Sequence, residues 1–474
     1  MIRASAGPVG HDEVAMASSR SLRRAGYAPN NTSVGRRGRH TRERILACAA
    51  DLFVADGYHD TSIEAIAEAV GGSRATIYQY FASKQEILLE LAAACRPAVF
   101  EHARNLGRLG PDEDGLRGLH RWLTGWAELR DKYAMVFVEF PGIGTIDKDT
   151  GTEFDTASHD YTKIIAAKLR TADIAGIDPT DTAAALLRVC HMLNLTQFRN
   201  MFGLADGSRV TVSLAVAMQR LIFPDTPAEV LLAVGGAPGP PAHGGTVSAA
   251  SGPAGFDDPD ASTVSPVRQD ILSAASVLFS ERGFYSVSME DVAAAAEVSR
   301  ATLYRHFSTK VDLLDELSSW STLESIHLSS ELLEFGTRQS ADTLRAWLAR
   351  YVHFHRAYNG VIRAWYDGAI ARQVSGDSVA RGMRTLHAAV RAFLTARRLP
   401  PGLDSDVAAA IFLAVLGRLS EYSTKQHPAE KDYGAAGFML LVLQRAILGE
   451  HLGEQTVSEV GRAGGPLHRH SKLT

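Results

Sequence analysis

The chain has 474 residues, a formal net charge of −4, and a composition of 46% hydrophobic and 22% charged residues. This length exceeds what one hydrophobic core organises, so two or more domains are expected, and the composition is that of a globular protein rather than a disordered or fibrous one. The three cysteines are far apart, which predicts thiols and neither a disulfide framework nor a zinc site. With no apolar signal segment at the N-terminus and no apolar run near the ~20 residues of a membrane span, we expect a cytoplasmic protein.

Residues 1–38 are rich in Ser, Ala, Gly and Arg and show no hydrophobic periodicity, so we expect a disordered arm. Arg36, Arg37 and Arg39 lie at the end of a run of arginines with few acidic neighbours. Such a run is either a solvated tail or, beside a nucleic-acid-binding unit, a salt-sensitive grip on phosphate or an adjacent minor groove.

The sequence after the arm predicts a helix followed by a helix-turn-helix. Apolar residues at 45–53 repeat with helical period. Thr61 and Glu64 have the spacing of a capping box at the start of a second helix. The pair Gly71–Gly72 predicts a turn, which leads to a short third helix at 73–81.

The helix expected at 73–81 has the side chains of a DNA-reading helix. Arg, Thr, Tyr and Gln can donate to and accept from base edges and phosphates, while apolar residues pack on the partner helix. An ordinary amphipathic helix is the alternative reading of this stretch alone.

The same pattern returns in the second half of the chain. Because 271 − 45 = 226, Ile271 corresponds to Ile45, and the offset of 226 holds without a gap to Leu91 and Leu317. Caps, turns and polar residues coincide along with the apolar ones, which indicates an internal repeat. Farther along the offset is 225, so the repeated unit is a complete protein of about two hundred residues.

We therefore predict an all-α fold made of two like units, each a three-helix head with a helix-turn-helix and a helical-bundle body. In chain order the predicted segments are the basic arm 1–38, a head 39–85, a body 86–223, a Gly- and Pro-rich flexible linker 224–266, a second head 267–311, a second body 312–452, and a disordered tail 453–474.

Each head resembles the N-terminal domain of TetR-type transcriptional regulators. The shared motif is Ser-x-x-Thr-x-Tyr-x-x-Phe followed by Ser/Thr-Lys, found at Ser73–Lys84 and again at Ser299–Lys310. The resemblance implies a DNA-binding regulator, a repressor whose grip on a double-stranded operator is modulated by a small molecule. It implies no cofactor, metal or catalytic residue, and no arrangement typical of an enzyme is found. The alternative is a sensor or scaffold in which one or both heads no longer bind DNA.

The resemblance assigns DNA contacts to the helix-turn-helix and the adjacent arm. In the first half these residues are Arg36, Arg37, Arg39, Thr61, Ser62, Ser73, Arg74, Ala75, Thr76, Tyr78, Gln79, Tyr80 and Lys84. In the second half they are Ser288, Ser299, Arg300, Ala301, Thr302, Tyr304, Arg305, His306 and Lys310.

The two copies depart from the family's turn, which is a Gly followed by a buried apolar residue. Gly72 occupies the apolar position in the first copy, and Glu297 occupies the Gly position in the second. A glutamate there must adopt a backbone conformation that favours glycine. The second head also lacks a basic arm, and Arg305 replaces Gln79. We expect it to grip DNA more weakly or to read a different half-site.

The bodies are expected to hold an effector that is mostly apolar, in a pocket lined by aromatic and histidine side chains. Core packing is the alternative for each of them. The candidates are Trp122, Trp126, Tyr133, Phe137 and His191 in the first body and Trp347, Tyr351, Phe354, Tyr358 and Trp365 in the second.

Two C-terminal helices of each body form a four-helix dimer interface in proteins of this type. The matching segments are 181–201, 210–223, 406–422 and 434–448. Two bodies on one chain favour an intramolecular pseudo-dimer, and a homodimer of like halves is the alternative.

Overall fold

The structure is a computed structural model, and it describes residues 36–139, 148–204, 206–235, 265–335, 340–366, 378–421 and 431–449. Within these ranges the chain forms helices and turns without strands, which confirms the all-α prediction. The predicted tail and most of the predicted arm lie outside the described residues.

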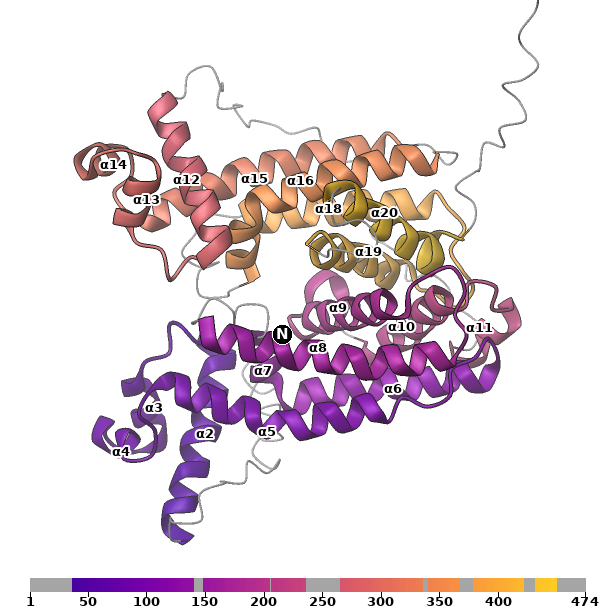
Figure 1. Cartoon of the computed structure of the whole chain (residues 1–474), viewed down its shortest axis with the longest axis horizontal. Helices are drawn as coiled ribbons and strands as arrows, with labels where there is room; N and C mark the ends of the chain where they lie inside the picture. The colour runs from indigo at the N-terminus through magenta and orange to yellow at the C-terminus, as the bar shows by residue number, and fades with distance from the viewer. Residues whose placement is uncertain are drawn as a thin grey trace, which may run out of the picture.

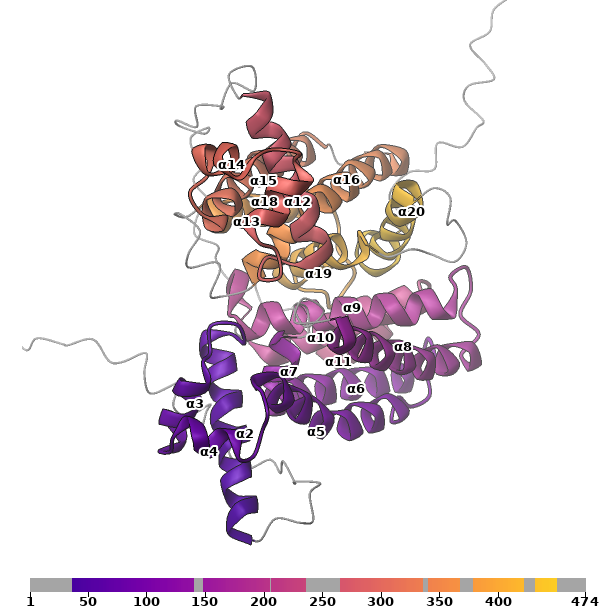
Figure 2. The same cartoon turned by 60° about the vertical axis from the view of Figure 1, so that its left-hand side comes forward.

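Each half begins with a three-helix head (Figure 1). Helices α4 and α14, the third helix of each head, lie on the same side of the molecule in both views (Figure 2). The bounds are α2 Arg36–Asp56, α3 Ile63–Val70 and α4 Arg74–Tyr78 in the first head, and α12 Pro266–Arg282, α13 Met289–Ala295 and α14 Arg300–His306 in the second.

A long helix leads from each head into its body. In the first half the body comprises α5 Lys84–Arg104, α6 Glu113–Lys132, α7 Ala134–Glu139, α8 Lys148–Thr171, α9 Pro179–Phe198, η2 Met201–Gly203, α10 Gly207–Ile222 and α11 Ala228–Gly235. In the second it comprises α15 Lys310–Leu333, α16 Ala341–Tyr366, α18 Ser378–Thr395, α19 Ser405–Leu419, α20 Lys431–Leu443 and η3 Gln444–Leu448.

The repeat extends to a helix break that the two bodies share. Tyr133 ends α6 with a non-helical φ of −121°, and α7 starts directly after it. Its counterpart Tyr358 lies at a kink inside α16, with φ −114°. The short segment after each break packs against the first helix of its own head, α2 or α12.

The two bodies pack against each other through α9 and α10 of the first half and α19 and η3 of the second. Small side chains on α9 and α19, such as Ala183 and Ala408, are fully buried and allow a close approach of the helices. One continuous hydrophobic core joins the first head and both bodies, whereas the second head has a separate core that includes Val361 of α16.

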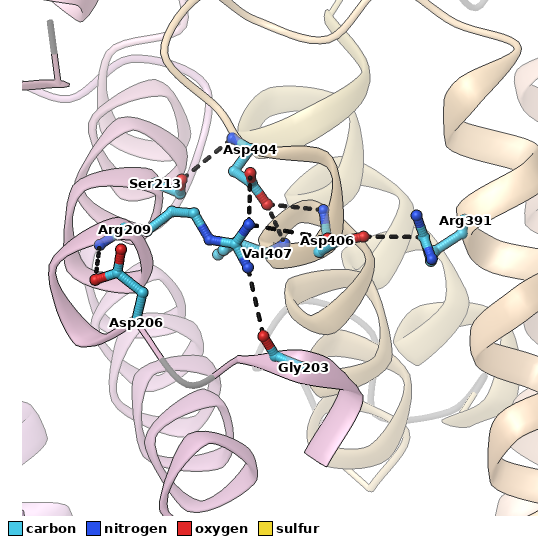
Figure 3. Close-up of polar contacts among 8 residues, drawn as sticks. All are labelled: Gly203, Asp206, Arg209, Ser213, Arg391, Asp404, Asp406 and Val407. Carbon is cyan, nitrogen blue, oxygen red and sulfur yellow. Dashed lines mark hydrogen bonds and ion pairs between the residues drawn. The ribbon is translucent and has the colours of Figure 1, made fainter. Parts of the chain in front are cut away.

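Polar contacts fix the register of this packing (Figure 3). Arg209 of α10 donates to the carboxylate of Asp404, at 3.4 Å, and lies 4.0 Å from Asp406. The backbone N–H of Asp404 donates to the hydroxyl of Ser213, at 3.1 Å. Arg391 of α18 contacts Asp406 from the other side, at 2.9 Å. Charged groups of both halves therefore meet at the start of α19.

The structure corrects two predicted boundaries. Part of the predicted linker 224–266 is helical, because Leu231 of α11 is buried and this helix packs on α6 and α10. At the N-terminus α2 begins at Arg36, so Arg36 and Arg37 belong to a helix and not to an irregular arm. Among the described helices, none is long and apolar enough to span a membrane.

Candidate DNA-binding site

Helix α4 is short, and its two ends are set by local hydrogen bonds and burial. The Ser73 hydroxyl accepts the backbone N–H of Thr76, and the Thr76 hydroxyl accepts that of Ser73, a reciprocal capping box. Ile77 is fully buried and holds the helix on the head, while Tyr78 is 48% exposed. In α14 the same positions are Ser299, which caps the helix, the buried Leu303, and Tyr304, which is 43% exposed.

The arginine that begins α4 and the arginine that begins α14 are each ion-paired with the preceding helix. Arg74 contacts Glu64 of α3 at 2.5 Å, and both side chains are more than half exposed. Arg300 contacts the corresponding Glu290 of α13 in the same way. These pairs are solvent-screened and contribute little stability. Each guanidinium can therefore exchange its glutamate for another acceptor, such as a guanine edge that accepts two hydrogen bonds.

The remaining predicted contacts on these helices lie on the outer surface or at its edge. The exposed ones are Ala75, Gln79, Ala301 and Arg305, and the half-buried ones are Thr76, Tyr80, Thr302 and His306. Their placement is compatible with DNA contact, which stays a prediction.

Lys84 and Lys310, which the resemblance assigns to DNA, bind loop carbonyls of their own heads with their ammonium groups. Lys84 donates to the carbonyls of Tyr58, His59 and Thr61, with the last at 2.8 Å. Lys310 donates to three carbonyls at the equivalent positions, 284, 285 and 287. An ammonium has three hydrogens, and three loop carbonyls lie within hydrogen-bond distance of each lysine. Both lysines hold the loop before the second helix of the head.

Thr61 is also misassigned as a DNA contact and as a helix cap. It is 2% exposed, and its hydroxyl donates to the carbonyl of Gly57 at 2.7 Å. The cap of α3 is Ser62, whose hydroxyl accepts the N–H of Ala65. Ser288 caps α13 in the second head. Ser62 and Ser288 are exposed and remain candidate DNA contacts.

Arg42 of α2 is part of the interior of the first head. It donates to the carbonyl of Tyr80, pairs with Glu90 of α5, and covers the ring of Phe81 at 4.1 Å. Arg268 makes the same three contacts in the second head, with His306, Glu316 and Phe307. Of the predicted arm residues, the side chains of Arg36 and Arg37 lie outside the described set, and Arg39 is exposed.

The helix-turn-helix turns have the same backbone despite different residues. Gly71 has φ 70° and Glu297 has φ 55°. The following N–H groups bond alike, from Gly72 to Ala67 and from Val298 to Ala293. The prediction that Glu297 must adopt a glycine-like conformation is confirmed.

The first body contains a buried aromatic cluster, part of which the sequence identified. The ring of Trp126 lies 5.1 Å from Phe137 and 5.3 Å from Tyr161, and Phe137 lies 6.1 Å from His191. The indole N–H of Trp126 is buried and has no hydrogen-bond partner in the described structure. Burial and the charge of Arg418 lower the pKa of His191 to about 3, so this ring is neutral at physiological pH.

His102 and Tyr161 belong to this cluster and were missed by the sequence analysis. His102 donates through Nε2 to the carbonyl of Trp122 at 2.8 Å, so its Nδ1 accepts from the Tyr161 hydroxyl at 3.1 Å. The indole N–H of Trp122 donates a hydrogen bond to the backbone carbonyl of His102. A single histidine on an otherwise polar helix end gave no signal of these contacts.

The second body is packed differently. Trp347 is fully buried, donates to the carbonyl of Leu328, and stacks on Tyr351 at 5.9 Å. Phe354 lies between Tyr351 and Tyr358, and the side chain of Trp365 lies outside the described set. Helix α18 packs closely on α15. On α15 a stripe of small hydroxyl side chains is buried, namely Ser318, Ser321, Thr322, Ser325 and Ser329.

Comparison with known proteins matches both heads to one family. The domain described as "Bacterial regulatory proteins, tetR family" matches residues 45–91 and 271–317. These are the segments that fold as the two helix-turn-helix heads with the start of α5 and α15.

Individual relatives match over a small part of the chain. The HTH-type transcriptional regulator TcmR of Streptomyces glaucescens is 42% identical over 62 residues, 13% of this chain and 27% of that protein. AcrR of Shigella flexneri, also an HTH-type transcriptional regulator, is 36% identical over 86 residues, 18% of this chain and 39% of that protein. HbdR of Aromatoleum sp. (strain CIB), another such regulator, is 29% identical over 127 residues, 27% of this chain and 52% of that protein.

The matched segments span about a quarter to a half of these relatives, 27% to 52%. The two matched segments are offset by 226 residues, the same offset as in the internal repeat. Each of them has the helix-turn-helix geometry described above. The chain therefore carries twice the N-terminal domain described for the tetR family of bacterial regulatory proteins.

Proposed function

We propose that this chain is a cytoplasmic DNA-binding transcriptional regulator that uses both of its heads on one operator. The observation that carries the proposal is the pair of capped, exposed helices α4 and α14, presented on one side of a single chain (Figure 1). Arg74 and Arg300 suit guanine edges, and Gln79 suits adenine. Because Arg305 stands where the first head has Gln79, we infer that the two half-sites differ.

We further propose that the two halves act as an intramolecular pseudo-dimer. The contacts of Arg209 and Ser213 with Asp404 support this arrangement because they are one-sided. At the offset of 225, the counterparts of Arg209 and Ser213 are Gly434 and Phe438, which cannot make them. A pairing of two second halves would leave the acidic start of α19 without its arginine partner across the interface.

The proposed mode of action is repression that ends when a small molecule enters the first body. Its aromatic cluster is neutral, and the buried indole N–H of Trp126 has no acceptor within the described structure. An unsatisfied buried donor costs roughly 1–3 kcal/mol. A mostly apolar effector with one acceptor oxygen would satisfy it. Because α5 runs from the head into this body, a shift of α5 would couple the effector to the head.

Selection of bound sequences from random double-stranded DNA tests the proposal, with the full-length wild type, Arg74→Ala and Arg300→Ala. We expect the wild type to select a bipartite site, and each variant to lose preference in one half-site only, by about 1–3 kcal/mol per lost bidentate contact. Loss of both half-sites together in each variant would contradict the assignment of one head to one half-site.

A control variant separates a specific contact from general loss of charge. Arg117→Ala removes an arginine on α6, 55% exposed and far along the chain from either head, and should leave the selected sequence unchanged. If the wild type selects no sequence at any salt concentration, the alternative of a sensor or scaffold without DNA recognition replaces the proposal.

A further inference from the structure

The two heads touch each other directly. The imidazole of His59, in the loop between α2 and α3, stacks on the phenol of Tyr285, in the loop between α12 and α13. The ring centroids are 3.7 Å apart and the planes are inclined by 17°. Figure 1 shows these two loops facing each other between the heads, on the side that also carries α4 and α14.

The stacked residues are equivalent positions of the repeat, since 285 − 59 = 226. The contact therefore lies where an approximate two-fold axis relating the heads would pass. In a symmetric dimer two identical rings would meet there. In this chain a histidine meets a tyrosine.

The stack is the central step of a row of aromatic rings that joins the cores of the two heads. Consecutive centroids are 5.3, 5.2, 3.7, 5.6 and 5.4 Å apart. The rings, in order from the first head to the second, are Phe53, Tyr58, His59, Tyr285, Phe284 and Phe279. Its terminal rings are fully buried, so a displacement of one loop is resisted by core packing at both ends.

The loops that carry the stack are held rigidly to their heads. Lys84 binds three carbonyls of the first loop and lies 4.4 Å from the ring of Tyr58. Lys310 does the same for the second loop, 4.5 Å from Phe284. Lys84 is the first residue of α5, which follows α4, and Lys310 is the first residue of α15, which follows α14. The position of each loop is therefore fixed relative to α4 or α14.

The histidine at the centre is uncharged under physiological conditions. Burial and the charges of Lys84 and Lys310 lower the pKa of His59 to about 4, and the charge of Asp60 opposes this effect. A neutral imidazole can stack on a phenol without desolvating a charge.

We propose that His59 and Tyr285 are positioning residues that hold α4 and α14 at one separation and so select one spacing between the two half-sites of the operator. The major groove returns to the same face of DNA only every 10–10.5 base pairs, so a fixed separation of two reading helices admits few spacings. The inference rests on DNA binding by both heads, and its test includes a measurement without DNA.

The first arm measures binding to operators built from the selected half-sites with 0, 1, 2, 3 or 4 base pairs added between them. The wild type should prefer one spacing. In His59→Ala and Tyr285→Ala this preference should fall by about two- to tenfold, the value of an aromatic pair. His59→Phe and Tyr285→Phe keep two stacked rings and should retain the preference. His327→Ala, at a site 69% exposed on α15, is the matched control.

The second arm measures the distance between spin labels on Glu68→Cys and Ala294→Cys, equivalent exposed positions on α3 and α13, in a Cys48→Ser background. The wild type should give one narrow distribution, and His59→Ala a broader one, with helicity unchanged. An unbroadened distribution overturns the proposal even if DNA binding is intact. A broadened distribution in a protein that binds no DNA supports the contact and rejects the proposed function.

Discussion

Lys84 and Lys310 show how one residue type fixes the geometry of each head. Each places its ammonium among three loop carbonyls and beside one aromatic ring. Charged hydrogen bonds of this kind are stronger than neutral ones. Burial lowers the pKa of Lys310, and Asp291 opposes this effect. This geometry gives both lysines a structural role within their heads.

Lys84→Met and Lys310→Met should destabilise their heads without weakening the salt dependence of DNA binding. Removal of the ammonium leaves loop carbonyls without a donor, which we expect to cost about 1–3 kcal/mol of head stability. The denaturant dependence of amide hydrogen exchange in α3 or α13 measures this loss of head stability. A lysine bound to phosphate would instead contribute a slope of about one in log Kd against log salt. Lys163→Met, 62% exposed on α8, is the control for loss of charge.

Glu297→Gly should stabilise the second head. The residue has φ 55°, where a side chain costs roughly 1–2 kcal/mol relative to glycine. We expect the gain to be about 1 kcal/mol, since glycine also loses more entropy on folding. Glu297→Ala removes the same charge but keeps a Cβ, so it should give no such gain. Amide exchange in α13 and α14 distinguishes the two variants.

The residues of the site differ in how far the sequence could reveal them. The caps Ser73 and Ser299 and the turn at Glu297 follow from local rules, because their partners lie within a few residues. The internal roles of Arg42 and Lys84 do not, because their partners are 38 and 26 residues away. Both copies of the repeat retain the arginine, its glutamate partner and the phenylalanine that it covers, and both retain the lysine. This agreement between the two copies was the only signal of these contacts in the sequence.

At the scale of elements, the two heads are docked on their bodies differently. Gly360 of α16 lies so close to α12 that an added Cβ would overlap the backbone of Phe279 and Ser280. The N–H of Gly360 also donates to the Ser280 hydroxyl at 3.1 Å. The counterpart in the first half, at the offset of 225, is Met135 of α7, which is 2% exposed. A side chain fills the first junction, whereas backbone contact closes the second.

Gly360→Ala should therefore separate the second head from its body. Overpacking of this kind costs about 1–3 kcal/mol, even though alanine favours a helix over glycine. Limited proteolysis and amide exchange in α12 should show an earlier opening of the second head, with the first head unchanged. Gly417→Ala in α19 is the matched control, because a Cβ there meets nothing within 4 Å. Equal exchange in both variants would contradict the close approach.

Element prediction from the sequence succeeded where periodicity and caps were strong and failed where composition was misleading. The helices of both heads were foreseen from apolar spacing, caps and the repeat, and the interface segments that form α9, α10, α19 and η3 were foreseen from the family resemblance. Helix α11 was not, because it follows two prolines and precedes a run rich in Gly and Pro. Its helicity depends on burial of Leu231 against α6 and α10, a tertiary contact.

On the scale of the whole molecule, buried histidines near the contact between the bodies make stability depend on pH. Burial and Arg418 lower the pKa of His191 to about 3. For His355, burial lowers the pKa to about 4; Glu421 opposes this, and Arg363, Arg418 and Arg356 add to it. Between pH 6.5 and these values the unfolded chain binds protons that the folded chain does not, so folding weakens as the pH falls.

We expect the free energy of unfolding to be constant above pH 7 and to decrease from pH 6.5 towards pH 4. Each of the two histidines contributes a slope of up to about 1.4 kcal/mol per pH unit in this window. Urea unfolding at pH 7, 6, 5 and 4.5 measures the slope. His355→Phe should reduce the slope by up to about 1.4 kcal/mol per pH unit, whereas His327→Phe, at an exposed site, should leave it unchanged. A slope that is the same in all three proteins would show that His355 does not contribute to it.

The joining of α9 and α10 to α19 and η3 within one polypeptide also has a consequence for dosage. A regulator assembled from two chains loses operator occupancy steeply when its expression falls, because assembly and binding both require protein. In the pseudo-dimer proposed above, both halves are made together in equal number, and their assembly does not depend on concentration. For a regulator of this kind, operator occupancy should rise with the first power of protein concentration.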